Sequence, residues 1–324
     1  MSKELFPDKV KPVLKVHFTD FWIGFDPENN FFINLLRESF LVELDAFNPD
    51  ILFYSYKGND FLSFKCNRVF FTGENIRPRL FDCDFALCFD YSSNKRIIRL
   101  PLYVLYKGYE TLVIPKDVDQ LMSQKSKFCS FVVSNKYSHK RISFFKKLSK
   151  YKKVDSGGSY LNNIGYAVVD KSEFLKPYKF NIAFENTAFP GYTTEKVMQP
   201  MVAGSIPVYW GNPLIDRDFN TKSFINWNDY GSDEAVIDKI IELDQDEVKY
   251  RKMLSEPWLT DNKFNQFNDI NIIKENFKSI VLDARSNTPV GTMAINKFLS
   301  VSFNYGICPF NVMLIKLRKK LIGF

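Results

Sequence analysis

Short apolar runs alternate with amphipathic segments in the first third of the chain. The run from Val13 to Phe18 is rich in β-branched and aromatic residues and predicts a strand. Residues 31–40 predict an amphipathic helix, and residues 51–56, which follow an Asn-Pro-Asp turn, predict a second strand. Further short apolar runs continue the pattern at 69–72, 85–89 and 97–106. This rhythm is typical of a parallel sheet covered by helices.

A polar interval at 116–127 separates this region from a second stretch with the same rhythm. Residues 128–134 predict a strand and residues 140–151 a basic helix, and shorter strand patterns follow at 153–155 and 180–184. A chain of 324 residues is long enough for two domains, each with its own core. We therefore expect two α/β domains in series that face a central cleft. The predicted ranges are 1–118, 119–292 and, for a C-terminal tail, 293–324.

Composition adds the expectation of a globular protein with an anionic partner. Hydrophobic residues make up 45% of the chain, and the formal net charge is +7. The positive charge suits a nucleotide diphosphate, a nucleic acid or an acidic membrane surface, without choosing among them. The first residues, MSKELFPDKVKPVLKV, contain no long apolar run of the kind that forms a signal peptide or membrane anchor. We therefore expect a cytoplasmic protein.

The residues that often carry metal or nucleophilic chemistry are scattered. Two histidines, His17 and His139, are too few for a multi-histidine metal site or a histidine-activated nucleophile. The chain lacks GxSxG, GxxxxGK[ST] and GxGxxG, which removes the simple hydrolase, P-loop and dinucleotide interpretations. The five cysteines lack zinc-site spacing and are expected to be reduced thiols; they are Cys66, Cys83, Cys88, Cys129 and Cys308. DxD triplets begin at Asp82, Asp117, Asp216 and Asp244. Their number weakens each one as a candidate metal site.

One segment in the second half carries the pattern of a charged helix start. Thr193 or Thr194 can cap a helix whose first turn then contains Glu195 and Lys196. The free N–H groups of a helix start beside a lysine suit a diphosphate, and a nearby carboxylate can accept hydrogen bonds from ribose. An ordinary acidic first turn with a solvated lysine is the alternative, and TEK alone favours it. Pro200 should kink or shorten this helix after its first turn.

Three linked motifs, FNIAFENT, GYTTEK and AGSIPVYWG, resemble in wording and order the donor-site signature of the α1,3/4-fucosyltransferases. Two upstream patches resemble the same family: the TGEN turn and RLPLY run within 69–103, and SFVVSN, Arg141 and VDSGG within 128–158. The resemblance implies a bacterial-type α1,3-fucosyltransferase of GT-B fold, with two Rossmann-like domains. It places the acceptor side in 1–118 and the GDP-fucose site in 119–292.

The resemblance also implies a reaction. Fucose would move with inversion from GDP-fucose to the 3-OH of GlcNAc or Glc in a β-galactoside such as N-acetyllactosamine, building Lewis-type glycans. Glu74 in TGEN matches the family's candidate base, which deprotonates the acceptor hydroxyl. Arg141 and Lys196 match positions that contact the diphosphate, where charge builds as it departs. A surface turn acid is the alternative for Glu74, and one cation of a solvated basic face is the alternative for Arg141.

Further matched positions complete the predicted donor site. Glu195 would hold the ribose or fucose, with Tyr192 and Asn186 shaping the pocket. The Gly157-Gly158 turn would let the nucleotide approach the backbone, and Glu185 would support its neighbours. An ordinary turn and an ordinary strand-end cap are the alternatives for the glycines and for Asn186. The family needs no bound metal for catalysis, so we expect no cofactor, with stimulation by a divalent ion left open.

Two features depart from the family pattern. Thr193 stands where the family usually has Val or Ile, and the chain lacks the heptad-repeat tail of some bacterial members. Instead, residues 309–324 place an apolar helical stripe beside four cations, which predicts either peripheral membrane contact or a helix packed on the N-terminal domain. We expect a location in the bacterial cytoplasm or on the cytoplasmic face of the membrane.

The competing functions are transfer from a different nucleotide sugar and a non-catalytic role in binding glycans or nucleotides. No nucleic-acid partner is expected.

Overall fold

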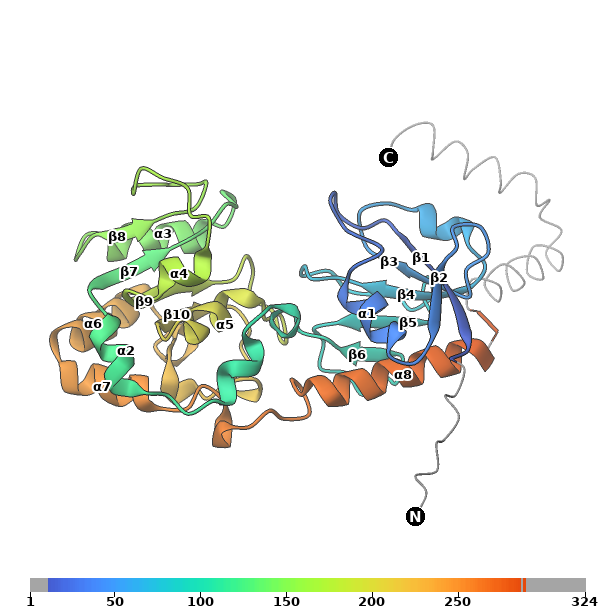
Figure 1. The fold of residues 1–324 in the computed structure, drawn as a ribbon. Coiled ribbons are helices and arrows are strands. Elements are labelled where there is room, and N and C mark those ends of the chain that lie inside the picture. Colours follow the sequence, from blue (N-terminus) through green and yellow to red (C-terminus); the bar gives the residue numbers. More distant parts are fainter. Residues whose placement is uncertain (1–10, 287, 290–324) are drawn as a thin grey trace, which may run out of the picture.

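The structure is a computed structural model that describes residues 11–286, 288 and 289, and it contains two α/β halves, each built on a parallel sheet (Figure 1). The first sheet has the strand order β2-β1-β3-β4-β5-β6, with every neighbouring pair parallel. Its strands are β1 (Val13–Thr19), β2 (Leu41–Leu44), β3 (Ile51–Tyr54), β4 (Asn67–Phe71), β5 (Phe85–Cys88) and β6 (Ile97–Arg99). Strands β3, β4 and β5 are buried along their whole length, as expected for a parallel sheet covered on both faces.

The second sheet has the order β11-β10-β9-β7-β8, again all parallel. Its strands are β7 (Lys127–Phe131), β8 (Val154–Ser156), β9 (Tyr178–Phe184), β10 (Ile206–Trp210) and β11 (Ile225–Asn226). The register pairs Phe184 with Trp210, so β9 and β10 end side by side. The segments that follow them, which carry most of the predicted donor site, therefore emerge at the same edge of the sheet.

The α-helices in the described residues are α1 (Phe31–Arg37), α2 (Val118–Gln124), α3 (His139–Leu148), α4 (Lys171–Leu175), α5 (Glu195–Val202), α6 (Asp233–Gln245), α7 (Glu247–Ser255) and α8 (Ile270–Ser286). Short 3-10 helices occur at Asp60–Ser63, Leu102–Leu105, Tyr109–Val113, Ile215–Arg217, Thr221–Ser223, Trp227–Asp229 and Thr260–Asn262. Of the helices in these ranges, none combines the length and the apolar composition that crossing a bilayer requires.

Helix α8 belongs to the first half in space although it follows the second half in sequence (Figure 1). The ring of Phe277 lies 6.2 Å from that of Phe32 and 5.9 Å from that of Phe53, between ring centroids. The side chain of Asn67 donates a hydrogen bond of 2.5 Å to the carbonyl of Ala284. Helix α8 thus falls within the predicted second-domain range, 119–292, but packs on the first sheet. An amphipathic pattern does not reveal which sheet a helix covers.

Two local expectations also need correction. The apolar run 97–106 contains only a three-residue strand, because Pro101 has no N–H to continue the ladder and a 3-10 helix follows it. The polar interval 116–127 contains α2, capped by the Asp117 side chain, which accepts a hydrogen bond of 3.0 Å from the backbone N–H of Gln120. The predicted tail contact at 309–324 lies outside the described residues, as does Cys308.

Candidate donor and catalytic site

Helix α5 begins where the sequence predicts. The Thr194 side chain caps it by accepting a hydrogen bond of 3.4 Å from the N–H of Lys196, and Glu195 and Lys196 form the first turn. Pro200 lies inside the helix, which ends at Val202 after eight residues. The proline removes a backbone hydrogen bond only after the first turn, so the short helix keeps its free N–H groups at the start.

Glu185 is fully buried directly after β9 and supports this helix start. Its Oε1 accepts a hydrogen bond of 2.7 Å from the N–H of Thr194, and its Oε2 accepts one of 2.7 Å from the Thr194 hydroxyl. The Lys196 ammonium lies 3.3 Å from Oε2. Burial raises the pKa of Glu185, and the charge of Lys196 opposes that rise. The buried carboxylate thus holds Thr194 and Lys196 in place. Its support of a donor site stays a prediction.

Arg141, on α3, is less exposed to solvent than Lys171 and Lys196, the other two cations near this helix start. Its side chain is 2% exposed, and its Nη2 donates a hydrogen bond of 2.6 Å to Oδ1 of Asn186. Its Nε is also buried but has no hydrogen-bond partner among the described residues. Burial lowers the pKa of the guanidinium, and the nearby Glu185 carboxylate raises it. The basic-face alternative for Arg141 is therefore wrong, because a solvated cation would not be buried.

Lys171 is a site residue that the sequence interpretation missed. It is the first residue of α4, which packs against α5, and its charge interacts with those of Glu195 and Lys196. Burial lowers the pKa of Lys171, and Glu195 opposes that effect. Within the described part of the chain, Lys171 forms no ion pair. The available signal was the Asp170-x-x-Glu173 capping pattern, in which Asp170 accepts a hydrogen bond of 3.1 Å from the Glu173 N–H.

Glu74 reaches the site from the first half. It follows β4 in a turn held by Thr72, whose hydroxyl accepts a hydrogen bond of 3.0 Å from the N–H of Glu74. The Tyr192 hydroxyl donates a hydrogen bond of 3.4 Å to Oε2 of Glu74. Tyr192 is buried against the ring of Phe89, and burial raises its pKa, so the phenol stays protonated and acts as a donor. A second contact across the halves joins the Asn75 amide to the Thr187 hydroxyl at 2.7 Å.

The Gly157-Gly158 turn is explained by packing within the protein. A side chain at Gly158 would place its Cβ 1.9 Å from the carbonyl oxygen of Val133, and one at Gly157 would lie 2.4 Å from a methyl group of Val168. Only glycine fits these approaches, which favours the ordinary-turn alternative. Contact of this turn with a nucleotide stays a prediction.

The DxD triplets have structural partners. Asp82 pairs with Arg79 at 2.8 Å, and Asp218, from the triplet that begins at Asp216, pairs with Arg99 at 2.6 Å. The residues that the structure describes contain no cluster of three or more His, Cys, Asp or Glu side chains suited to a metal ion. The four cysteines within these residues are free thiols, as predicted.

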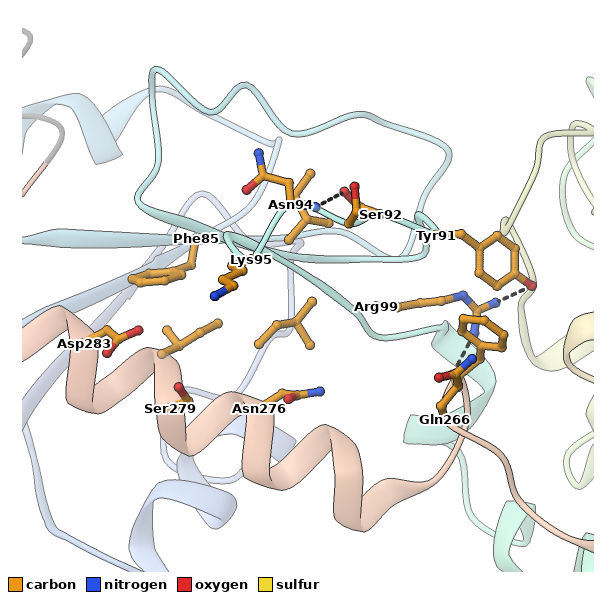
Figure 2. A pocket seen from close by; sticks show the side chains of 15 residues that line it. Phe85, Tyr91, Ser92, Asn94, Lys95, Arg99, Gln266, Asn276, Ser279 and Asp283 are labelled. Atoms are coloured by element: carbon orange, nitrogen blue, oxygen red, sulfur yellow. Dashed lines mark hydrogen bonds between the residues drawn. The ribbon is translucent and has the colours of Figure 1, made fainter.

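A separate cavity of about 400 Å³ lies between β6 and α8 (Figure 2). Polar side chains from α8 and from the segment before β6 line it, among them Lys95, Asn276 and Asp283. It contains none of the predicted site residues, and it is distinct from the place where Glu74, Tyr192 and the start of α5 meet.

Two α/β domains, each built on a parallel sheet, are the architecture of the GT-B class of glycosyltransferases. In this chain a carboxylate of the first domain lies close to a charged helix start of the second. Residues 16–106 match the N-terminal domain model of the α-(1,3)-fucosyltransferase FucT, and residues 122–278 match the C-terminal model of glycosyltransferase family 10, the fucosyltransferases. The chain belongs to this family.

Relatives and solved structures agree with that assignment. The chain is 33% identical to the α-(1,3)-fucosyltransferase FucT of Helicobacter pylori over 79% of its own length, and 32% identical to α-(1,3)-fucosyltransferase B of Drosophila melanogaster over 53%. It spans 62% of the first relative and 44% of the second. A crystal structure of an α1,3-fucosyltransferase with GDP-fucose matches with a TM-score of 0.74 and 31% identity, covering 86% of this chain and 94% of that one.

Proposed function

We propose that this protein transfers L-fucose from GDP-fucose to the 3-OH of GlcNAc or Glc in a β-galactoside, with inversion at the anomeric carbon. The observation that carries the proposal is the contact of Glu74 with Tyr192, which brings a carboxylate of one domain to the charged helix start of the other. Solved relatives have been crystallised with GDP-fucose and with GDP, which supports this donor.

The donor diphosphate would bind among Arg141, Lys171 and Lys196. Arg141 offers a buried Nε–H without a partner among the described residues, and Lys171 is a half-buried cation without an ion pair there. Burying a charge without a partner is costly, so an anion that completes these contacts is stabilised. The free N–H groups at the start of α5 add further donors. Glu195, beside Lys196, would accept hydrogen bonds from sugar hydroxyls.

Glu74 would act as the general base. Its carboxylate accepts the proton of the acceptor 3-OH while that oxygen forms a bond to the anomeric carbon of fucose. The bond from this carbon to the phosphate oxygen breaks, and GDP leaves with the electron pair, stabilised by the three cations. Tyr192 occupies only Oε2 of Glu74, so Oε1 can receive the proton. Attack from the face opposite the departing phosphate inverts the configuration.

The test is transfer from GDP-fucose to a panel of N-acetyllactosamine, its type 1 isomer and lactose, with linkage and anomeric configuration read by NMR. We expect α1,3 transfer to N-acetyllactosamine. Binding of GDP without transfer to any acceptor would support a non-catalytic binding protein instead. Transfer from a different nucleotide sugar, with GDP-fucose inert, would support a glycosyltransferase that uses that other donor.

A further inference from the structure

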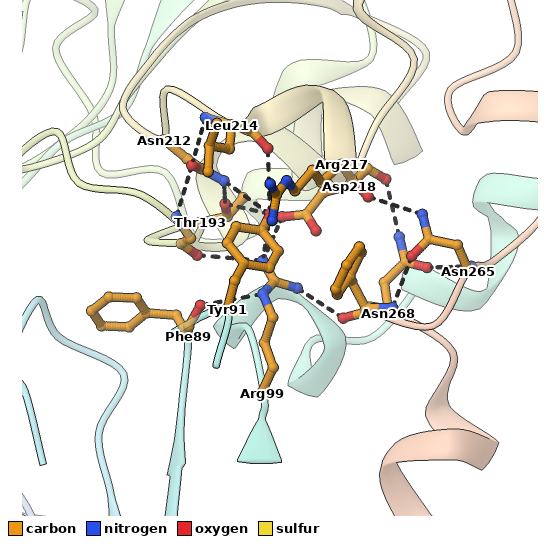
Figure 3. A network of polar contacts seen from close by, with 12 residues as sticks. Phe89, Tyr91, Arg99, Thr193, Asn212, Leu214, Arg217, Asp218, Asn265 and Asn268 are labelled. Atoms are coloured by element: carbon orange, nitrogen blue, oxygen red, sulfur yellow. Dashed lines mark hydrogen bonds and ion pairs between the residues drawn. The ribbon is translucent and has the colours of Figure 1, made fainter. Parts of the chain in front are cut away.

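A buried ion pair joins the two domains beside the donor site (Figure 3). Arg99 ends β6 of the first domain, and Asp218 follows the 3-10 helix at Ile215–Arg217 of the second. Nη2 of Arg99 lies 2.6 Å from Oδ2 of Asp218, and their side chains are 7% and 0% exposed. Burial disfavours both charges, so this pair persists only because its members are also held by neighbouring groups.

Arg99 donates a hydrogen bond of 2.8 Å to the carbonyl of Phe267, and other neighbouring groups belong to the loop that enters α5. Nη2 of Arg99 also donates to the carbonyl of Gly191 at 3.4 Å, and Oδ2 of Asp218 accepts a hydrogen bond of 3.3 Å from the Thr193 hydroxyl. The Asn212 side chain accepts a hydrogen bond of 2.8 Å from the N–H of Gly191 and donates one of 3.1 Å to the Thr193 hydroxyl (Figure 3). The backbone on both sides of Tyr192 is therefore tied to one interdomain network.

The first domain also touches this loop directly. Gly191 has a φ of +86°, and a Cβ there would lie 2.3 Å from the carbonyl oxygen of Phe89, so glycine is required both by conformation and by space. Nε of Arg99 donates to the same carbonyl of Phe89 at 3.2 Å. The carbonyl of Phe89 therefore accepts a hydrogen bond from Arg99 and also lies close to the backbone of Gly191, while the Phe89 ring packs against Tyr192.

We propose that Arg99 and Asp218 are positioning residues for transfer: they fix the Gly191–Thr193 loop so that Tyr192 meets Glu74 and the start of α5 faces the base. This inference rests on the proposed function. Thr193 is part of the arrangement, because its hydroxyl donates a hydrogen bond to Asp218 that a valine at this position could not make. Neither Arg99 nor Asp218 needs to touch substrate for this role.

The experiment compares Arg99→Lys and Asp218→Asn with the matched control Arg96→Lys. Arg96 donates to the carbonyls of Leu80, Cys83 and Asp84, all within the first domain, so its variant loses arginine contacts without affecting the interdomain network. We expect both test variants to lower kcat roughly 10- to 100-fold because the base and donor are misaligned, with the Kd for GDP nearly unchanged. The control should retain kcat, and Thr193→Val should show a smaller loss.

Hydrogen exchange supplies a readout that does not depend on activity. Peptides that cover 187–194 should exchange faster in Arg99→Lys than in the parent protein or in Arg96→Lys, while peptides from β4 and β7 should not. A folded Arg99→Lys protein with unchanged kcat and exchange would overturn the proposal. Equal losses of kcat and GDP affinity in test and control variants would also overturn it. If the parent protein transfers no fucose, the proposed function fails, and the exchange pattern alone decides whether Arg99 positions the loop.

Discussion

At the scale of single residues, the proposed donor site combines three cations, Arg141, Lys171 and Lys196, with two carboxylates, Glu185 and Glu195, at least partly shielded from solvent. Burial opposes the charge of Glu195, but Lys196 and Lys171 outweigh it and lower the pKa of this carboxyl. Burial likewise opposes the charge of Lys196, while Glu185 and Glu195 raise its pKa above the ordinary value. The charges therefore stabilise one another, and the surplus cation leaves the site suited to an anionic ligand.

Glu74→Gln keeps the volume of the side chain but removes its ability to take a proton. We expect fucose transfer to fall by about 10³-fold, with the Kd for GDP unchanged, because Glu74 belongs to the first domain whereas the cations proposed to bind GDP belong to the second. Steady-state transfer and calorimetric GDP titration check this. Glu43→Gln, at an exposed carboxylate on β2, is the control and should behave like the parent. Normal transfer by Glu74→Gln would require a different base.

Lys171→Met tests the cation that lacks an ion pair among the described residues. Losing a charge-assisted contact to the diphosphate should weaken GDP binding by about 10-fold, which calorimetry can measure. Lys176→Met is the matched control, because Lys176 lies just past the other end of α4 and, among the described residues, pairs only with the exposed Glu173, at 2.5 Å. Equal GDP affinity in the two variants would remove Lys171 from the donor site.

At the scale of elements, the start of α5 depends on one hydroxyl. Thr194→Ala removes the helix cap and leaves the buried Glu185 without the hydroxyl that contacts both of its oxygens, so we expect the free energy of unfolding to fall by about 2 kcal/mol. Thr194→Ser keeps the hydroxyl and should recover most of the loss. Urea unfolding of both variants measures the difference. Equal destabilisation by alanine and serine would assign the effect to the lost methyl group instead.

At the scale of the whole molecule, the first domain is completed by a helix from the far end of the described chain. Phe277→Ala removes a ring that packs between Phe32 and Phe53, and we expect a loss of about 3 kcal/mol in the free energy of unfolding. Phe189→Ala, at a partly exposed ring, is the control for stability and should cost far less. A Phe277→Ala protein as stable as the parent in urea would show that α8 is dispensable.

Metal removal is a second test at this scale. We expect transfer to continue after dialysis against EDTA, because the proposed mechanism stabilises the departing diphosphate with protein cations. Activity assays with and without added divalent ions measure the effect. Loss of transfer with EDTA and recovery with a divalent ion would mean that a metal shares this role.

The sequence allowed much of this architecture and site to be predicted, and the misses have physical causes. Periodicity located most strands because buried parallel strands are continuous apolar runs, and capping chemistry located α5 because it is local. Lys171 was missed because the Asp170-x-x-Glu173 capping pattern predicts a helix start but does not show whether the lysine in its first turn is solvated. The packing of α8 on the first sheet was missed because an amphipathic pattern does not show which sheet a helix covers.

The sequence by itself determined the family, the two parallel-sheet domains and the chemistry available at TGEN and TTEK, since these depend on residue types at short spacings. Tertiary structure alone decided that Glu74 meets Tyr192, that Glu185 is enclosed and that Arg99 reaches Asp218. Each of these contacts joins residues that sheet order and domain packing bring together. Burial then strengthens the electrostatic interactions between them. Such information is distributed over the whole fold and is absent from any local pattern.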